Sequence, residues 1–498
     1  MARTNSLIEQ NKETGEVSLL SPTAMPKASA FLWNQKMMIH VNCRGFAVAQ
    51  HIQPEPAKYA HAPNLEAKTF MQPEQPYYAH HPGRFFYIKD EENGQLFSAP
   101  YEPCRSEPEH FEFIAGKETI KWLVKRDDLD ITLQLSLAKD QPIEKWSFRI
   151  TNRGNRSRKL SIYPYFTIGY MSWMNQDCVF DHKLDAVIAS SVTPYQKYPD
   201  YFKQKDFKDK TYLLADQTPD AYELQRELFE GEGGLHRPDG LQADLLSNSD
   251  ARYETPAAVL QYRLAMESGH SREFRFLFGP AHSEAEIEAI KRKYFDPVDR
   301  HFVFNSSSKD DDWSDNLWID SPDEGFNHFV NHWLPRQVFY HGDVNRLSTD
   351  PQTRNYLQDN MGMTYLSASK ARAAFFTAIS QQERSGAMPD GILLNEEAEL
   401  KYINQVPHTD HCVWLPICLE AYLDETDDYA FLTEMAGFKD SEDHLSIADH
   451  IHLAMQWLLD NRDHRGLNFI DQGDWCDPMN MVGYQGKGVS GWLTLATA

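Results

Sequence analysis

The sequence predicts a protein of two parts, an antiparallel β-sandwich followed by a domain of helices. Up to about residue 280, short runs of alternating, β-branched or aromatic residues are separated by turn signals, which is typical of antiparallel strands. After residue 283 the apolar residues recur at helical spacing. The length of 498 residues is enough for roughly two to four domains of ordinary size.

The first part is predicted to be a large sandwich domain over residues 1–282. Turn sequences such as Glu92-Asn93-Gly94 separate its strands. The predicted strands include 85–88, 131–135, 146–150 and 160–163. Between about 190 and 255, stretches rich in Pro, Asp, Gly and Lys predict long loops or an insertion.

A linker over residues 283–320 is predicted to begin with a helix at 283–295. Ser283 is expected to cap this helix, because Glu286 follows three residues later as in a capping box. The helical domain then covers residues 321–498. Its predicted helices include 326–340, 361–379, 412–423 and 445–459.

Charge and composition restrict the partners and the compartment. A formal net charge of −24 at pH 7 argues against nucleic acid or an anionic membrane as a partner. Three features predict a cytoplasmic protein. The six cysteines are scattered without a CxxC pair, the N-terminal stretch is polar, and the sequence has no long apolar segment. Eleven tryptophans fit the handling of carbohydrate, although large cores that need rings would explain them as well.

The stretch 471–484, DQGDWCDPMNMVGY, gathers the groups that we expect in an active site. Asp474 and Asp477 lie three residues apart on either side of Trp475. Pro478 disfavours a helix here, so both carboxylates can face a cleft from a loop. A carboxyl group held against an indole is desolvated, which raises its pKa toward that of a general acid for a glycosidic oxygen. A loop closed by an Asx-turn with a packed tryptophan would account for the same spacing.

Six motifs, in order along the chain, resemble those of glycoside hydrolase family 94. They are GRFFYIKDEENGQLFS at 83–98, WSFRITNRGNRSRKLSIYPYFTI at 146–168, HWLPRQ at 332–337, RNYLQDNMG at 354–362, TDHCVWLP at 409–416 and GDWCDPMN at 473–480. The resemblance implies a β-sandwich, a helical linker and an (α/α)6 barrel. It also implies an inverting phosphorylase that cleaves a β-glucosyl disaccharide, of the cellobiose or cellobionic acid type, with inorganic phosphate to give α-glucose 1-phosphate.

By position in the last motif, Asp477 corresponds to the general acid of the family, and Trp475 to a ring beside the donor sugar. One carboxylate fits this chemistry, because inorganic phosphate is already an anionic nucleophile and no second residue has to deprotonate water. Asp474 is then either a further substrate contact or a carboxylate that caps its loop. No cofactor is implied besides phosphate as a co-substrate, and no spacing of His, Cys and carboxylate residues indicates a metal site.

Four further residues follow from the resemblance as substrate contacts. Arg346 matches in spacing a family arginine near the donor and the phosphate, and its guanidinium can fork onto either; a surface arginine near a loop is the alternative. Arg354 and Asp359 belong to the segment RNYLQD. Asn355 stands where the family has a donor-contacting aspartate, and its amide carries no charge. This departure implies altered specificity, with an aldonic acid such as gluconate as the acceptor.

Trp173 lies in a stretch, 170–175, that resembles a family loop reaching the active site of the other subunit, so a homodimer is implied by analogy. Asp410 and His411 replace an Asp-Asp pair and are interpreted as structural. About 175 residues follow Ser321, whereas a twelve-helix barrel needs roughly 300. The barrel is therefore expected to be incomplete and to aggregate through exposed apolar helix faces.

Two other classes of function stay open on the sequence. An inverting hydrolase on a related helical barrel would need a second, basic carboxylate across the cleft, and it would act without phosphate. A noncatalytic carbohydrate-binding relative would bind glucosides and turn none of them over.

Overall fold

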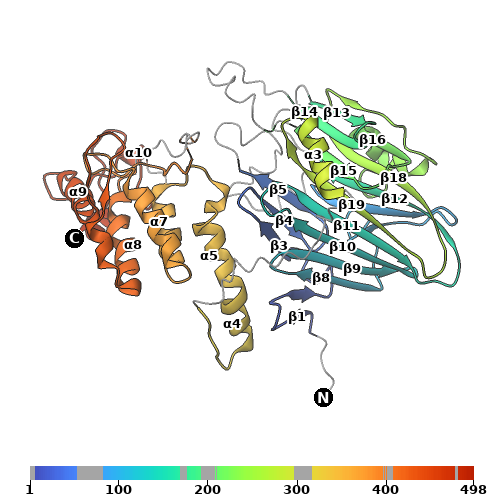
Figure 1. Cartoon of the computed structure of the whole chain (residues 1–498), viewed down its shortest axis with the longest axis horizontal. Coiled ribbons are helices and arrows are strands. Elements are labelled where there is room, and N and C mark those ends of the chain that lie inside the picture. The colour runs from blue at the N-terminus through green and yellow to red at the C-terminus, as the bar shows by residue number, and fades with distance from the viewer. Residues whose placement is uncertain are drawn as a thin grey trace. The chain divides into compact units, whose positions relative to one another are not determined.

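The computed structural model describes residues 6–52, 82–168, 176–191, 208, 210–295, 317–395, 398, 400, 408–476 and 480–498. The chain divides into two compact units: the first comprises Met1–Ile52 and Ala57–Ser307, the second Gln53–Pro56 and Ser308–Ala498. Sheets build the first unit and helices dominate the second (Figure 1). The predicted order of a sheet-rich part and a helical part is therefore confirmed.

The larger sheet of the first unit has eleven strands within the described residues. In spatial order they are β1 (Ile8–Gln10), β2 (Val17–Leu19), β8 (His110–Ala115), β9 (Thr119–Arg126), β10 (Leu129–Leu137), β11 (Glu144–Asn152), β19 (Ser271–Ala281), β15 (Lys210–Ala215), β14 (Ala186–Ser191), β13 (Gln176–Asp181) and β17 (Ala251–Arg252). Neighbouring strands run antiparallel.

The second sheet has five strands in the described part of the chain, and a smaller sheet has three. The five are β16 (Ala221–Gln225), β18 (Pro256–Met266), β12 (Arg158–Thr167), β6 (Arg84–Asp90) and β7 (Leu96–Ala99), and the three are β3 (Ser29–Trp33), β4 (Met37–Asn42) and β5 (Ala47–His51). Short helical turns follow β16, namely α2 (Arg226–Glu230) and the 3₁₀ turns Gly231–Gly233 and Asp239–Gln242.

The two large sheets pack face to face. The ring of Phe86 on β6 stacks on that of Phe148 on β11, with centroids 4.9 Å apart and an interplanar angle of 12°. A buried ion pair also joins the sheets, since Arg84 Nη2 lies 2.8 Å from Glu144 Oε1. Along β10 the residues alternate between buried and half-buried, as expected of a strand with one face toward a core. The predicted sandwich is confirmed by these contacts.

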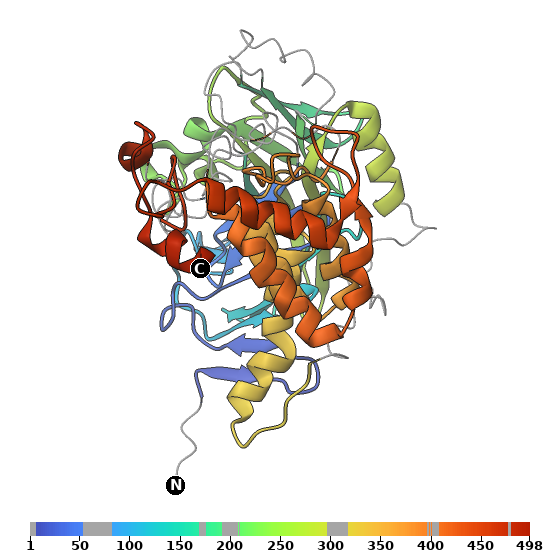
Figure 2. The same cartoon turned by 90° about the vertical axis from the view of Figure 1, so that its left-hand side faces the viewer.

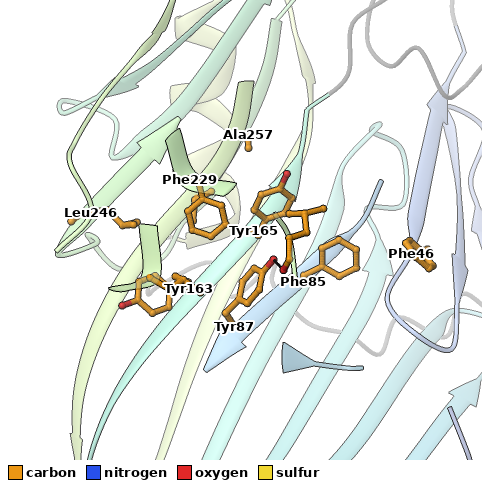
Figure 3. Close-up of a cluster of buried hydrophobic side chains, with 12 residues drawn as sticks. Phe46, Phe85, Tyr87, Tyr163, Tyr165, Phe229, Leu246 and Ala257 are labelled. Atoms are coloured by element: carbon orange, nitrogen blue, oxygen red, sulfur yellow. Dashed lines mark hydrogen bonds between the residues drawn. The ribbon is translucent and has the colours of Figure 1, made fainter. Parts of the chain in front are cut away.

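The five-stranded sheet is buried on its other face as well (Figure 3). Phe85, Tyr87, Tyr163 and Tyr165 form a cluster there with Phe229 of α2. The Tyr87 hydroxyl donates a hydrogen bond to the carbonyl oxygen of Leu235 at 2.8 Å, so its polar group is satisfied inside the cluster. Because both faces of the five-stranded sheet are buried, the sequence of strand β6 is a continuous apolar run and does not alternate between apolar and polar residues.

The prediction of long loops between about 190 and 255 was partly wrong. Strands β15 and β16 lie in this range. They are short, and their pairing with β19 and β18 supplies stability that no local pattern reveals. The predicted helix after residue 283 is present as α3 (Glu284–Phe295), with the Ser283 hydroxyl accepting from the Glu286 amide at 3.3 Å. Its apolar side packs in a core cluster with Leu277 of β19.

The second unit holds eight α-helices within its described residues. They are α4 (Glu324–His328), α5 (Leu334–Gly342), α6 (Thr353–Met363), α7 (Ala368–Ile379), α8 (His411–Thr426), α9 (Ile447–Asp460), α10 (Asn480–Gly483) and α11 (Gly491–Thr497). A π-helical turn, Phe329–Trp333, joins α4 to α5, 3₁₀ turns span Asn345–Leu347 and Tyr429–Thr433, and β20 (Met435–Ala436) pairs with β21 (Leu445–Ser446). Figure 2 shows α8 and α9 side by side, and α6 contacts both α7 and α8.

Most of the predicted helices are present, but the prediction of one continuous helix over 361–379 was wrong. Helix α6 ends at Met363 and α7 starts at Ala368, and Ser367 before α7 has a non-helical backbone, with φ −153° and ψ 83°. The helices of the described residues are too short or too polar to cross a membrane. The (α/α)6 closure and the domain limits at 282 and 320 stay predictions.

Candidate active site

Helix α6 and the loop 471–476 position most of the described residues that the sequence singles out. Arg354 and Asn355 lie in the first turn of α6, and Asp359 lies one turn after Asn355 on the same side. Asp474 and Trp475 lie in the loop. The segment before α8 holds this loop by backbone contacts, since the Thr409 amide donates to the Gly473 carbonyl at 3.1 Å.

Arg354 connects α6, α8 and the loop from inside the unit. Its Nη1 donates to Asp410 Oδ2 at 2.8 Å and to the carbonyl oxygen of Asp474 at 2.9 Å. The same Asp410 oxygen accepts from Trp414 Nε1 at 3.1 Å. Arg354 is only 3% exposed. This geometry supports the loop, and a direct contact of Arg354 with a sugar stays a prediction.

Asp474 is used to shape its own loop. It is 2% exposed. Its Oδ1 accepts from the Cys476 amide at 2.8 Å, which is the Asx-turn that the sequence left as an alternative. Its Oδ2 accepts from the hydroxyl of Ser490, and that hydroxyl caps α11 by accepting from the Leu493 amide. Both carboxylate oxygens thus have partners in the protein, which favours the loop-capping role over a substrate contact.

Trp475 is presented at the surface of the unit, with 49% of it exposed. Its ring centroid lies 5.8 Å from that of Trp414 and 6.2 Å from that of Trp492. The guanidinium carbon of Arg354 lies 5.3 Å from the Trp475 ring centroid. An exposed indole braced by two other indoles and a cation offers a flat, well-positioned surface for the apolar side of a sugar ring.

Arg346 lies on a turn of unusual backbone conformation. Asn345, Arg346 and Leu347 have φ values of 53°, 54° and 57°, a region that residues other than glycine rarely adopt. Three such residues in succession indicate a turn that its surroundings hold in place, as is frequent at functional sites. Arg346 Nη2 contacts Asp359 Oδ2 at 2.5 Å, which joins this turn to α6.

The pKa of the Asp359 carboxyl is shifted upward. Burial raises its pKa to about 6, although the Arg346 guanidinium acts in the opposite direction. His341 Nδ1 lies 3.7 Å from Asp359 Oδ1, and burial followed by the charge of Arg346 lowers the pKa of this histidine. Asp359 therefore titrates close to neutral pH, which makes it a candidate for contact with a substrate hydroxyl or phosphate.

Asn355 is half-buried on α6. The remaining predicted residues, Asp477 and Trp173, lie outside the described residues, so the assignments of the general acid and of the intersubunit contact stay predictions. The residues that sequence reasoning missed are Trp492 and Ser490, which brace Trp475 and Asp474 from the segment 489–493. In the sequence, the one indication of their role is that Ser490 lies three residues before Leu493 in an apolar run. This pattern is common at the start of a helix, so it does not point to a functional site.

A two-sheet β unit followed by a helical unit that presents a braced indole is typical of carbohydrate-active proteins. Two family models match the chain: the supersandwich domain of glycosyl hydrolase 94 over residues 72–297, and the catalytic domain of the glycosyl hydrolase 94 superfamily over residues 311–497. The chain belongs to glycoside hydrolase family 94.

Curated relatives share this family signature at different levels of identity. The chain is 58% identical to a cellobionic acid phosphorylase of Neurospora crassa, over 99% of this chain and 62% of that protein. It is 29% identical to a 3-O-β-D-glucopyranosyl-β-D-glucuronide phosphorylase of Paenibacillus borealis, over 83% of this chain and 54% of that protein. Among solved structures, a bacterial glucoamylase complexed with acarbose aligns with a TM-score of 0.45 and 9% identity, over 87% of this chain and 68% of that chain. The chain thus spans about half to three fifths of the length of these two curated relatives.

Proposed function

We propose that this chain is part of an inverting phosphorylase that cleaves cellobionic acid with inorganic phosphate into α-glucose 1-phosphate and gluconic acid. The identity of 58% with a protein of that name, maintained over 99% of this chain, supports the choice of substrate. The substrate also agrees with the uncharged Asn355 in the family's donor motif, a departure that implies altered specificity.

The reaction needs one proton donor and one nucleophile. In the proposal, the Asp477 carboxyl donates its proton to the glycosidic oxygen while the bond from that oxygen to the anomeric carbon breaks. A phosphate oxygen forms the new bond on the opposite face of the sugar, which inverts the configuration. Because phosphate is already an anion, the protein does not have to supply a second carboxylate as a base.

The observation that carries the proposal within the structure is the position of Trp475. Its indole is half-exposed and braced, and it lies two residues before Asp477 in the chain. A glucose ring stacked on this indole would bring its anomeric carbon near the loop that bears the proposed acid. Arg354 and Asp474 would then act behind the indole, by holding the loop in this conformation.

The proposal includes several finer features. The helical unit would belong to an (α/α)6 barrel, and two copies would form a homodimer in which Trp173 reaches the partner's site. Inorganic phosphate would serve as co-substrate, without a further cofactor in the reaction. The enzyme would act in the cytoplasm.

The synthetic direction tests the substrate most directly. The natural protein that contains this chain is incubated with α-glucose 1-phosphate and one acceptor at a time, and released phosphate is measured. We expect gluconate to be used at least tenfold faster than glucose at equal concentration. Equal use of the two acceptors would contradict the proposed substrate, and hydrolysis of cellobionic acid at the same rate without phosphate would indicate a hydrolase.

A further inference from the structure

Three side chains of the metal-ligand type meet beside the loop 471–476. Asp390 comes from the stretch after α7, His408 from the segment before α8, and His411 is the first residue of α8. One carboxylate oxygen and one nitrogen from each ring lie within 4.8 Å of one another. His411 Nε2 lies 3.6 Å from Asp390 Oδ1.

The environment of His411 points to a missing partner. The ring is completely buried, and within the described residues neither of its nitrogens forms a hydrogen bond. The distance of 3.6 Å from Nε2 to Asp390 is too long for one, and so is the 3.7 Å from Nδ1 to Asp410 Oδ1. Burying an imidazole without hydrogen bonds to its nitrogens costs free energy. We therefore expect a further group to bind one of the ring nitrogens.

We propose that Asp390, His408 and His411 bind a divalent metal ion of the zinc type. Two imidazoles and a carboxylate are a common donor set for Zn²⁺. Ligand atoms around a tetrahedral ion with bonds of 2.0–2.1 Å lie about 3.4 Å apart, which is close to the His411–Asp390 separation. The three donor atoms, which lie within 4.8 Å of one another, would draw closer together to complete the set.

Asp410 fits the second layer of such a site. In many metal sites the histidine binds the ion with one nitrogen while the other faces a carboxylate, which orients the ring. Here His411 Nε2 faces Asp390 and Nδ1 faces Asp410 Oδ1, an oxygen that is buried and has no hydrogen bond within the described residues. The other oxygen of Asp410 holds Arg354. The ion would therefore be linked through Asp410 to the support of the loop.

The proposed site also lies directly against the loop 471–476. His408 forms backbone bridges with Asp471 and Gly473, and a Cβ atom on Gly473 would come within 2.6 Å of its ring. An ion on His408 would thus lie directly behind the loop that carries Trp475. Its role would be to brace this loop and not to take part in bond breaking.

Metal content and a cobalt spectrum test the proposal. The natural protein that contains this chain is stripped with a chelator, loaded with Zn²⁺ or Co²⁺, dialysed and measured for metal per chain. We expect one equivalent of metal, visible d–d absorption with Co²⁺, and a higher melting temperature with metal. The variants His411→Gln and Asp390→Asn should bind at least tenfold more weakly. His452→Gln, which alters an exposed histidine of α9, is the matched control and should bind like the wild type.

Two outcomes would overturn the proposal. The first is a folded wild type that retains metal in less than about a fifth of its chains and shows no cobalt absorption. In that case His411 hydrogen-bonds to the flanking carboxylates and binds no metal. If the two site variants bind as tightly as the wild type, the metal lies elsewhere on the chain. A variant that does not fold leaves the decision to the stoichiometry and cobalt spectrum of the wild type.

Discussion

Arg354 and Asp410 form an ion pair at 2.8 Å in the interior of the helical unit, and the same arginine nitrogen donates to the carbonyl oxygen of Asp474. This one guanidinium therefore joins α6, the start of α8 and the loop that presents Trp475. Because the pair is shielded from water, removing one partner leaves a buried charge without compensation.

Replacing Arg354 should destabilise the helical unit strongly. For Arg354→Ala we expect a loss of about 3–5 kcal/mol, since the Asp410 carboxylate stays buried without its partner. Lys370→Ala is the control, because its ion pair with Asp343 is half-exposed and should contribute at most about 1 kcal/mol. Urea unfolding followed by tryptophan fluorescence measures both. An Arg354 variant as stable as the control would show that the pair does not hold the loop.

Removing the exposed indole should affect binding far more than stability. For Trp475→Ala we expect the affinity for glucosides to fall roughly tenfold, or about 1.4 kcal/mol, while the melting temperature stays nearly constant. Trp318→Ala is the matched control, because this tryptophan is 59% exposed and is not part of the cluster of Trp414, Trp475 and Trp492. Calorimetric titration with a glucoside provides the comparison. Equal affinities in the two variants would remove Trp475 from the sugar site.

Asp359 should titrate near pH 6. The difference from the ordinary value of 3.8 corresponds to roughly 3 kcal/mol against the ionised form. Because the folded state then holds a proton that the unfolded chain releases, this group lowers stability as the pH rises from about 4 to about 6. The ¹³C shift of the labelled carboxyl group, identified by its loss in Asp359→Asn, measures the midpoint. A midpoint near 4 would mean that the Arg346 pair fully offsets the effect of burial.

Ser490 should matter more than an ordinary helix cap. It caps α11 and also donates to the buried Asp474 carboxylate. For Ser490→Ala we expect a loss of about 2–3 kcal/mol, since a cap and a partner of a buried charge disappear together. Ser446→Ala removes a similar cap from α9, where the serine is half-buried and its hydrogen bond is exposed, and should cost only about 1 kcal/mol. Chemical denaturation of the two variants tests the difference.

Local patterns were sufficient for much of the fold. The apolar spacing predicted α8 and α9, and the capping pattern at Ser283 predicted α3. Strands β15 and β16 escaped notice because their stability comes from distant partners. The break between α6 and α7 was missed because the helical spacing of apolar residues continues across it.

The candidate site shows the same division between local and distant causes. The motif around Trp475 predicted an indole in a loop, and the structure places it there. The Asx-turn of Asp474 was one of the alternatives that the spacing left open, but the contact of Asp474 with Ser490, which lies 16 residues further along the chain, does not follow from spacing. The grouping of Asp390 with His408 and His411 likewise arises only once the loop and the start of α8 have come together.

The phosphate dependence of cellobionic acid cleavage in wild type and Asp477→Asn tests the central claim most directly. In the natural protein that contains this chain, we expect the wild type to release α-glucose 1-phosphate only when phosphate is present. Asp477→Asn should lose roughly 10³-fold or more of this rate at unchanged stability, whereas Asp443→Asn, which alters an exposed carboxylate, should retain it. An Asp477→Asn enzyme within tenfold of the wild type, or free glucose formed equally fast without phosphate, would contradict the account.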